Sequence, residues 1–500
     1  MTEPVTPESP SQSLATNQTN LDKAVVGGLA WTAGVKWFSQ ILTWIITVVV
    51  ARLLTPADYG LVGMATIFLG LITLFSEFGL GTAVITFHEL TDKQLSQLHT
   101  VSLLLGVLGF FMSCGLALPL GLFFRAPKLP LVIIVTAVGF LVVAYRTVPY
   151  SLLQKEMRFK LLALLEGVQV IAQAISTLVL AILGFGYWAL VLGGLIGKTA
   201  SAVLPFVYKP FGLSRPRWSS ISKELTFSWH VILGRLFYYA YDNADMLIVG
   251  RVLGEVPLGA YSLAYNMAHV PVEKFSTLIG RVTPSLFAAV QNDLVALRRY
   301  LRNLTQGISL VTFPAVFGTA MVAPEFVHLL LGKKWETAIV PLQLLALYAS
   351  FRAIRTLIAP LLNALGEPRV VKTNSLLILL VLPVCFYIGT HWGTTGVAAC
   401  WVLVYPILSL PLLLAVLQKL EMSKREYFNA LWPALSGSIP MVLLVGFLKW
   451  SLPTSLPLYL RFGSEILAGA AIYSLTLFAL HRERLLAFYQ LRRLLTKADG

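Results

Sequence analysis

Long apolar segments recur along almost the whole chain, separated by short connections that contain glycine, proline or charged residues. A helix that crosses a membrane needs roughly 20 consecutive apolar residues, and these segments reach that length. The strands of a membrane β-barrel would instead alternate apolar and polar positions over about 10 residues. The pattern therefore predicts an all-α integral membrane protein with fourteen spans, near residues 24–52, 60–86, 98–124, 129–153, 161–184, 187–208, 223–250, 257–288, 303–331, 337–364, 370–390, 393–417, 428–450 and 461–481.

The remaining segments give the predicted domain organisation. Residues 1–22 are rich in Ser, Thr, Pro, Asn and Gln and lack the features of a signal peptide, so they are predicted to form a disordered cytoplasmic tail. The predicted order after this tail is a six-span N-lobe (23–208), a cytoplasmic linker (209–222), a six-span C-lobe (223–418), two further spans (419–481) and a basic amphipathic cytoplasmic tail (482–500).

An internal repeat relates the two lobes. A gapless shift of 199 residues aligns the first two spans with spans seven and eight. Because six spans precede the second copy, both copies enter the membrane from the same side, which predicts a parallel pseudo-symmetric pair that rocks to give alternating access. The aligned pairs are Lys36 with Arg235, Phe38 with Phe237, Arg52 with Arg251, Leu54 with Leu253, Gly60 with Gly259, and Ala65 with Ala264.

Composition and charge sharpen this picture. The 500 residues are 57% hydrophobic and only 12% charged, against roughly 25% charged in soluble domains, which excludes a soluble enzyme. Of the 38 basic residues, 22 fall on the predicted cytoplasmic side and 8, including Lys449, on the other. The positive-inside rule then places both termini in the cytoplasm. The net charge of +15 is thus a topology signal, and no nucleic-acid partner is expected.

Some ionisable residues lie within the predicted spans, where they are costly and usually face a cavity or a partner. Basic residues outnumber acidic ones there, so a shared cavity would be cationic and suit an anionic cargo. The candidates for substrate binding are Lys36, Arg146, Lys198, Arg235, Tyr238, Arg281, Arg352 and Arg355. The candidates for ion coupling or gating are Glu77, Asp242, Asp245 and Glu273.

Span seven is the most polar span, and helical spacing puts Arg235, Tyr238, Tyr241, Asp242 and Asp245 on one face. A cation, phenols and carboxylates on one stripe can bind an anionic ligand and its sugar hydroxyls. The alternative is a stripe of interhelical salt bridges that only fixes packing.

Arg352 and Arg355 lie one helical turn apart on span ten. Two guanidinium groups on one face suit a phosphate or diphosphate, because each can donate two parallel hydrogen bonds. The alternative is a partner acid on another span, such as Glu77 or Asp245. For Arg146 and Arg281 the alternative is snorkelling toward the membrane surface, and Lys198 fits either a structural or a cavity role.

Catalytic and cofactor motifs are missing from the sequence. There is no P-loop, HExxH, GxSxG or acidic metal-binding cluster in the connections, and the three cysteines lie in apolar runs without a CxxC motif. No cofactor, metal or enzymatic activity is therefore expected.

Several short motifs, in order, resemble a known family. They are residues 51–65 (ARLLTPADYGLVGMA), 75–81 (FSEFGLG), 243–254 with 258–261, 280–284 (GRVTP) followed by 298–302 (RRYLR), 332–335 (GKKW) and 364–368 (ALGEP). The chain resembles the polysaccharide transporters of the multidrug/oligosaccharidyl-lipid/polysaccharide flippase superfamily, in particular the WzxC/TuaB-like flippases. The polar N-terminal tail departs from the family core.

The resemblance implies a MATE/MurJ-like fold with two six-helix lobes around a cationic cavity. It implies that an ion gradient, of H+ or Na+, drives undecaprenyl-diphosphate-linked oligosaccharide from the cytoplasmic to the periplasmic leaflet. The expected partners are this lipid-linked substrate, the lipid bilayer and the polysaccharide polymerase machinery. The rival functions are a multidrug or organic-cation antiporter of the same superfamily and a membrane-embedded glycosyltransferase or ligase.

Overall fold

The computed structural model describes residues 40, 42–77, 80–87, 90–156, 158–208, 212–217, 236, 238–453 and 455–498. These residues form helices joined by short turns, and none of them is in a β-strand. The chain divides into two compact units. Unit 1 comprises Met1–Leu54 and Phe68–Leu236, and unit 2 comprises Thr55–Ile67 and Phe237–Gly500.

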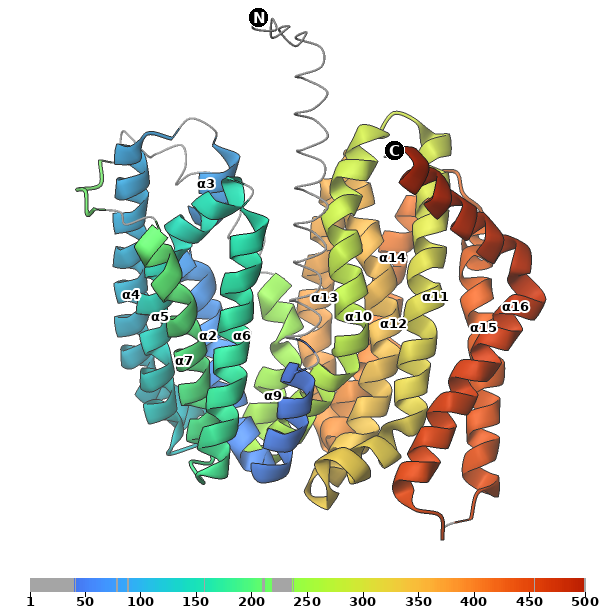
Figure 1. Cartoon of the computed structure of the whole chain (residues 1–500), viewed down its shortest axis with the longest axis horizontal. Coiled ribbons are helices and arrows are strands. Elements are labelled where there is room, and N and C mark those ends of the chain that lie inside the picture. The colour runs from blue at the N-terminus through green and yellow to red at the C-terminus, as the bar shows by residue number, and fades with distance from the viewer. Residues whose placement is uncertain are drawn as a thin grey trace, which may run out of the picture. The chain divides into compact units, whose positions relative to one another are not determined.

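In the described part of the chain, unit 1 contains the helical stretch Leu42–Leu53, the second part of α2 (Pro56–Glu77) and the helices α3 to α7 (Figure 1). Within it α4 packs on α5, α6 on α7, and α5 on α7. Thr91 fixes the start of α4, because its hydroxyl accepts from the backbone N–H of Gln94 while the Gln94 side chain accepts from the backbone of Thr91. The helices are α3 (Leu80–Thr86), α4 (Asp92–Phe124), α5 (Leu129–Lys155), α6 (Phe159–Ile182) and α7 (Tyr187–Tyr208).

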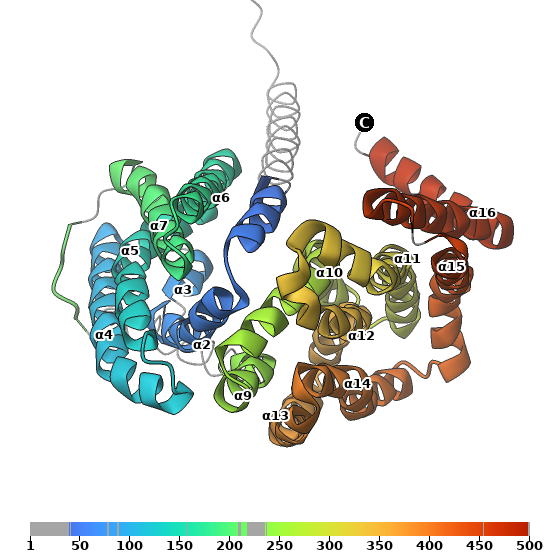
Figure 2. The ribbon, with the colours of Figure 1, turned by 90° about the horizontal axis from the view of Figure 1, so that it is seen from below.

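Unit 2 contains the first part of α2 and the helices from α9 onward. α12 lies at its centre, packed against α10, α11 and α14, while α15 and α16 lie together against α11 (Figures 1 and 2). The helices are α9 (Ala244–Val252), α10 (Glu255–Ala289), α11 (Leu294–Phe326), α12 (Ile339–Ala364), α13 (Pro368–Gly389), α14 (Gly393–Lys419), α15 (Lys424–Ser451) and α16 (Leu458–Ala498). Short π and 3₁₀ turns, η1 (Val327–Leu331), η2 (Lys333–Ala338) and η3 (Thr390–Trp392), join some of them.

Where the structure describes the chain, the predicted spans match these helices, but the predicted tail 1–22 and large parts of the predicted spans 24–52 and 223–250 lie outside the described residues. In the described part of the chain, nine helical stretches are long and apolar enough to cross a membrane, and one of them, Pro368–Lys419, contains both α13 and α14. Large apolar side chains face outward on these helices, among them Leu122, Leu380 and Leu467, each more than 70% exposed. Lipid solvates such a surface as well as a protein core would, so the all-α membrane fold is confirmed, while the count of fourteen spans stays a prediction.

A kink in α16 lies at the predicted end of the last span. α16 contains one non-helical residue, His481, with φ −132° and ψ 26°, and the helix bends there (Figure 1). The predicted change from span to amphipathic tail lies between residues 481 and 482, so the kink coincides with it.

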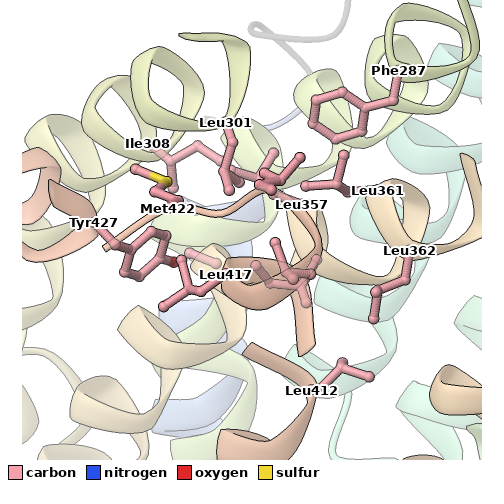
Figure 3. Packing of buried hydrophobic residues seen from close by; sticks show 14 of the residues in the cluster. Phe287, Leu301, Ile308, Leu357, Leu361, Leu362, Leu412, Leu417, Met422 and Tyr427 are labelled. Carbon is pink, nitrogen blue, oxygen red and sulfur yellow. The ribbon is translucent and has the colours of Figure 1, made fainter. Parts of the chain in front are cut away.

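A buried apolar cluster fixes α12 directly after its two arginines. Leu357, Leu361 and Leu362 of α12 pack with Phe287, Leu301, Ile308, Leu412, Leu417, Met422 and Tyr427 from the neighbouring segments (Figure 3). These leucines are fully buried, and in a membrane such residues hold helices together by close van der Waals packing. The position of Arg352 and Arg355 is thus set by an apolar anchor one to two turns further along the same helix.

The two halves of the predicted repeat meet at a pair of glycines. A Cβ on Gly60 of α2 would lie 1.8 Å from the carbonyl oxygen of Glu255, and a Cβ on Gly259 of α10 would lie 1.7 Å from the carbonyl oxygen of Pro56. Gly60 and Gly259 are 199 residues apart, as are Pro56 and Glu255, the first residues of the two helices. The helices therefore cross in a pseudo-symmetric contact that only glycine permits, which supports the predicted repeat.

Candidate functional site

Three helices of unit 2 turn polar and aromatic faces toward one another. Four-residue spacing aligns Tyr261, Tyr265 and His269 on α10, while Trp401 and Tyr405 align in the same way on α14. α12 lies between them and packs on both helices. Its residues Tyr348, Arg352 and Arg355 follow at steps of four and three, so both arginines face α10 and α14.

Arg352 is bound by two phenols and one carboxylate. Its Nη1 donates to the Tyr265 hydroxyl at 2.5 Å, and its Nη2 donates to the Tyr238 hydroxyl at 3.1 Å. The same Nη2 lies 3.5 Å from Oδ2 of Asp242, which is the longest of these three contacts of Arg352. Thus the acid partner of Arg352 is Asp242, and not Asp245, which was one of the partners considered from sequence.

Arg355 is bound by phenols. Its Nη1 donates to the hydroxyl of Tyr405 and, at 3.4 Å, to that of Tyr241. The guanidinium carbon also lies 5.1 Å from the ring centroid of Tyr405 and 5.9 Å from that of Tyr241, within cation–π range. These partners are neutral, so they orient the guanidinium without cancelling its charge. Arg352, Arg355, Tyr238, Tyr241, Asp242, Tyr265 and Tyr405 are called the arginine cluster below.

Asp245 occupies a different environment from Asp242, although the two are only three residues apart. Asn243 interrupts the helix between them, with φ −117° and ψ 5°. Asp245 is fully buried and accepts hydrogen bonds from the Tyr261 hydroxyl at 2.7 Å, the Trp401 indole N–H at 2.8 Å and the backbone N–H of Met246 at 2.7 Å. The predicted single stripe on span seven is therefore split, because the helix on which it depends is not continuous.

Unit 1 brings together two other predicted residues, Arg146 of α5 and Lys198 of α7. Nη1 of Arg146 donates to Gln169 Oε1 on α6 at 2.6 Å and to Ser201 Oγ on α7 at 2.7 Å. Lys198 lies one turn before Ser201, whose hydroxyl also donates to the Lys198 carbonyl oxygen at 2.8 Å. Both cations are half-buried within the helical bundle of unit 1.

Other predicted site residues lie outside the described residues or side chains. Lys36 and Arg235 belong to undescribed segments. Glu77, Glu273 and Arg281 lie in helices, but the structure does not describe their side chains. Their roles stay predictions.

A third charged group joins three helices of unit 2. Lys449 of α15 forms ion pairs with Glu325 of α11 and, at 3.5 Å, with Glu465 of α16. The Glu465 side chain is fully buried, and Arg461, one turn earlier on α16, places a second positive charge near it. Glu325, Lys449 and Glu465 are called the lysine clasp below.

Neutral members of the arginine cluster escaped the sequence reasoning. Tyr265 and Tyr405 carry no charge, so a search for buried ions does not find them, and Trp401 looks like an ordinary apolar residue. The i, i+4 spacing of aromatic residues on α10 and α14 is the signal that would have pointed to them.

Comparison with known proteins assigns the family. The family model described as "Polysaccharide biosynthesis protein" matches residues 49–340, more than half of the chain. The chain belongs to this polysaccharide biosynthesis family. This agrees with the resemblance carried by the short motifs.

Curated relatives and solved structures add detail. The chain is 28% identical over 457 residues to an uncharacterized membrane protein in the cps region of Klebsiella pneumoniae, covering 90% of this chain and 93% of the relative. It is also 28% identical to the lipopolysaccharide biosynthesis protein WzxC of Escherichia coli K12, covering 82% of this chain and 86% of WzxC.

Two solved structures share the fold. The lipid II flippase MurJ in an inward closed conformation matches with a TM-score of 0.73 at 16% identity, over 91% of this chain and 99% of MurJ. An inward-facing multidrug resistance MATE transporter matches with a TM-score of 0.60 at 16% identity, over 78% of this chain and 95% of its own. The expected MATE/MurJ-like fold is confirmed, and the protein is a multi-pass membrane protein.

Proposed function

We propose that this protein is a flippase that moves polyprenyl-diphosphate-linked oligosaccharide, with undecaprenyl as the lipid, across the bacterial inner membrane. The observation that carries the proposal is the arginine cluster, in which Arg355 is held by the phenols of Tyr241 and Tyr405. A diphosphate offers anionic oxygens that suit two guanidinium groups one turn apart. Membership of a polysaccharide biosynthesis family supplies the glycan part of the proposed cargo.

Phenols and arginines together suit both parts of such a ligand. Tyr238 is 48% exposed beside Arg352, so its ring and hydroxyl are available to a sugar next to the diphosphate. Tyrosine rings combine an apolar face with a polar tip, and this combination fits sugar rings with their hydroxyl groups. Arg352 and Arg355 would hold the diphosphate, and Tyr238 would contact the first sugar.

For ion coupling, the proposal is that the carboxylate of Asp242 binds the coupling ion. Its contact with Arg352 is a single 3.5 Å pair, and its side chain retains 17% exposure. Binding of H+ or Na+ to Asp242 would weaken this pair and free Arg352 for the cargo, so ion binding and cargo binding would be linked. A polysaccharide polymerase remains an expected partner of the exported unit.

A multidrug antiporter shares the fold but fits the chemistry less well. The fold itself does not decide between the two functions, since both a flippase and a drug transporter adopt it. An exporter of organic cations would be expected to offer a carboxylate to its cargo. Here the carboxylate of Asp245 already accepts hydrogen bonds from Tyr261, Trp401 and the backbone of Met246. The carboxylate of Asp242 is already paired with Arg352.

The test removes the two charges. In a strain of the source bacterium that lacks its own copy of the gene, Arg352→Gln with Arg355→Gln should lower polysaccharide export on the order of 100-fold or more, because two charge-assisted hydrogen-bonding groups are lost. The matched control is Arg369→Gln with Lys372→Gln, two exposed cations at the same spacing on α13. This control should export normally.

Membrane insertion of both double variants is checked by their abundance in the membrane fraction. Wild-type export by the Arg352/Arg355 variant at normal abundance would refute the assignment of the diphosphate to the arginine cluster.

A further inference from the structure

A second copy of the Arg355 segment lies in unit 1. Residues 144–153 (AYRTVPYSLL) of α5 align without a gap with residues 353–362 (AIRTLIAPLL) of α12, at a shift of 209. Five of the ten positions are identical, and they include the Arg-Thr pair at Arg146 and Arg355. α5 and α12 are the fourth predicted spans of their lobes, so the alignment extends the repeat seen at the first two spans.

The two segments are also buried alike. The alanine two residues before the arginine is buried in both copies, as are the two residues after the Arg-Thr pair, while Arg146 and Arg355 are both half-buried. The threonine hydroxyls donate to a carbonyl on the preceding turn of their own helix in both copies. Sequence and local structure thus make Arg146 the counterpart of Arg355.

Each arginine is bound by the sixth predicted span of its own lobe. Arg146 donates to Ser201 on α7, and Arg355 donates to Tyr405 on α14. Each also has a phenol ring beneath its guanidinium, at 5.2 Å for Arg146 over Tyr150 and 5.1 Å for Arg355 over Tyr405. Each arginine thus contacts a phenol ring and a hydroxyl of the sixth span, although Tyr150 belongs to α5 itself and Tyr405 to α14.

A second cation accompanies the arginine in unit 1 as in unit 2. Lys198 extends toward Gly139 on α5. A Cβ added to Gly139 would lie 3.2 Å from Nζ of Lys198, so the glycine leaves room for the lysine side chain. Gly139 lies two turns before Arg146 on the same face of α5. The interface of α5 and α7 therefore carries two cations, as the α12 face carries Arg352 and Arg355.

Each cation pair has one acid close by. Glu166 of α6 accepts from the hydroxyl of Tyr150, the tyrosine beneath Arg146, at 2.7 Å. Asp242 has the corresponding place in unit 2, next to Arg352. The two units therefore resemble each other also in the acid that lies beside the cations.

We infer that Arg146 and Lys198 form a second anion-binding site, duplicated from the site at Arg355 and able to take the same class of group. That class is the clustered anionic oxygens of a diphosphate or of an acidic sugar's carboxylate. The inference rests on the proposed function and adds that one molecule of the protein binds two such anionic groups, one in each unit.

The test counts bound anions. Geranyl diphosphate, a soluble short-chain polyprenyl diphosphate, is titrated into the purified full-length protein in detergent and followed by isothermal titration calorimetry. The wild type should bind two equivalents, Arg146→Gln one, Arg355→Gln one, and the double variant none. A wild type that binds one equivalent or none, or an Arg146→Gln variant that keeps two, would overturn the inference.

The geranyl diphosphate that still binds to Arg355→Gln shows which class of anion the unit 1 site prefers. In Arg355→Gln, displacement of the remaining geranyl diphosphate by inorganic pyrophosphate assigns the unit 1 site to phosphate oxygens. Displacement by glucuronate alone assigns it to carboxylates. Displacement by neither anion contradicts an anion site in unit 1.

Two further variants protect the test from misfolding. Arg146→Lys keeps the charge and should keep two equivalents, and Lys198→Gln, which removes the second cation, should weaken the unit 1 equivalent at least 10-fold. Thermal unfolding without ligand reports whether each variant is folded. Failure of the proposed function has a separate signature, which is normal export by the Arg352/Arg355 variant whatever the number of bound anions.

Discussion

The arginine cluster and the lysine clasp both place cations among helices of unit 2, yet they differ in what the cations touch. Lys449 forms ion pairs with two carboxylates, Glu325 and Glu465, whose side chains are almost completely buried. Arg355 contacts phenols, and Arg352 pairs with the carboxylate of Asp242 at 3.5 Å. A lysine matched by two acids has little capacity left for a ligand, whereas a guanidinium oriented by neutral hydroxyls keeps its charge.

This difference separates a structural role from a binding role. The lysine clasp ties α15 and α16 to α11, so its loss should appear as lost stability. Loss of the arginine cluster should instead lower transport and change stability little. The decisive property is the ratio of charges, because the arginine cluster has two cations and one acid, whereas the lysine clasp has one cation and two acids.

The largest effect on stability is expected for Lys449→Met. This change leaves the carboxylates of Glu325 and Glu465 buried without their cation, which typically costs about 3–5 kcal/mol. The unfolding midpoint of the purified protein in detergent should fall on the order of 10 °C. Export per folded molecule should stay within about twofold of the wild type.

The control for this prediction removes the acids as well. In the triple variant Lys449→Met, Glu325→Gln, Glu465→Gln the three charges of the clasp are removed together, and replacing a whole ion pair is often neutral for stability. The triple variant should therefore regain most of the lost midpoint. If Lys449→Met alone unfolds like the wild type, the clasp does not neutralise the two carboxylates and the comparison fails.

The sequence predicted the spans well because their signal is physical and local. The start of α5 at Leu129, the start of α7 at Tyr187 and the kink of α16 at His481 all coincide with predicted boundaries. A bilayer requires a continuous apolar length, and glycine, proline or charge interrupts it. These features can be read without knowledge of the neighbouring helices.

The site was predictable only in part, because its partners are distant in sequence. Arg352 and Arg355 stood out as ions in an apolar span, but Tyr405 is fifty residues away and neutral. The break at Asn243 was not foreseen either, and it sends Asp242 and Asp245 to different partners. Lys449 was counted with the residues outside the spans, since nothing in its own segment indicates Glu325 or Glu465.

An intermediate effect is expected for Tyr405→Phe. The change removes the hydroxyl that accepts from Arg355 but keeps the ring beneath the guanidinium and its packing on Trp401. A hydrogen bond to a charged group contributes about 1.5–3 kcal/mol, so export should fall on the order of 10-fold as Arg355 loses its orientation. Export is measured per folded molecule in the gene-deleted strain.

A matched tyrosine provides the control. The Tyr473 hydroxyl of α16 donates to the carbonyl of Leu310 at 2.7 Å, in the part of unit 2 that holds the clasp. Tyr473→Phe should lower stability by about 1 kcal/mol and leave export unchanged. Equal loss of export in the two variants would mean that the effect of Tyr405 is a general consequence of a missing hydroxyl.

The smallest effect is expected for Tyr238→Phe, and it bears most directly on the contrast between the two regions. The Tyr238 side chain is 48% exposed, and Arg352 keeps Tyr265 and Asp242 when this hydroxyl is lost. Stability should therefore change by less than about 0.5 kcal/mol, as at other exposed positions. Export should still fall about two- to fivefold, because the lost hydroxyl is the one placed to meet a sugar. A stability loss that approached that of Lys449→Met would mean that the arginine cluster, like the clasp, mainly holds helices together.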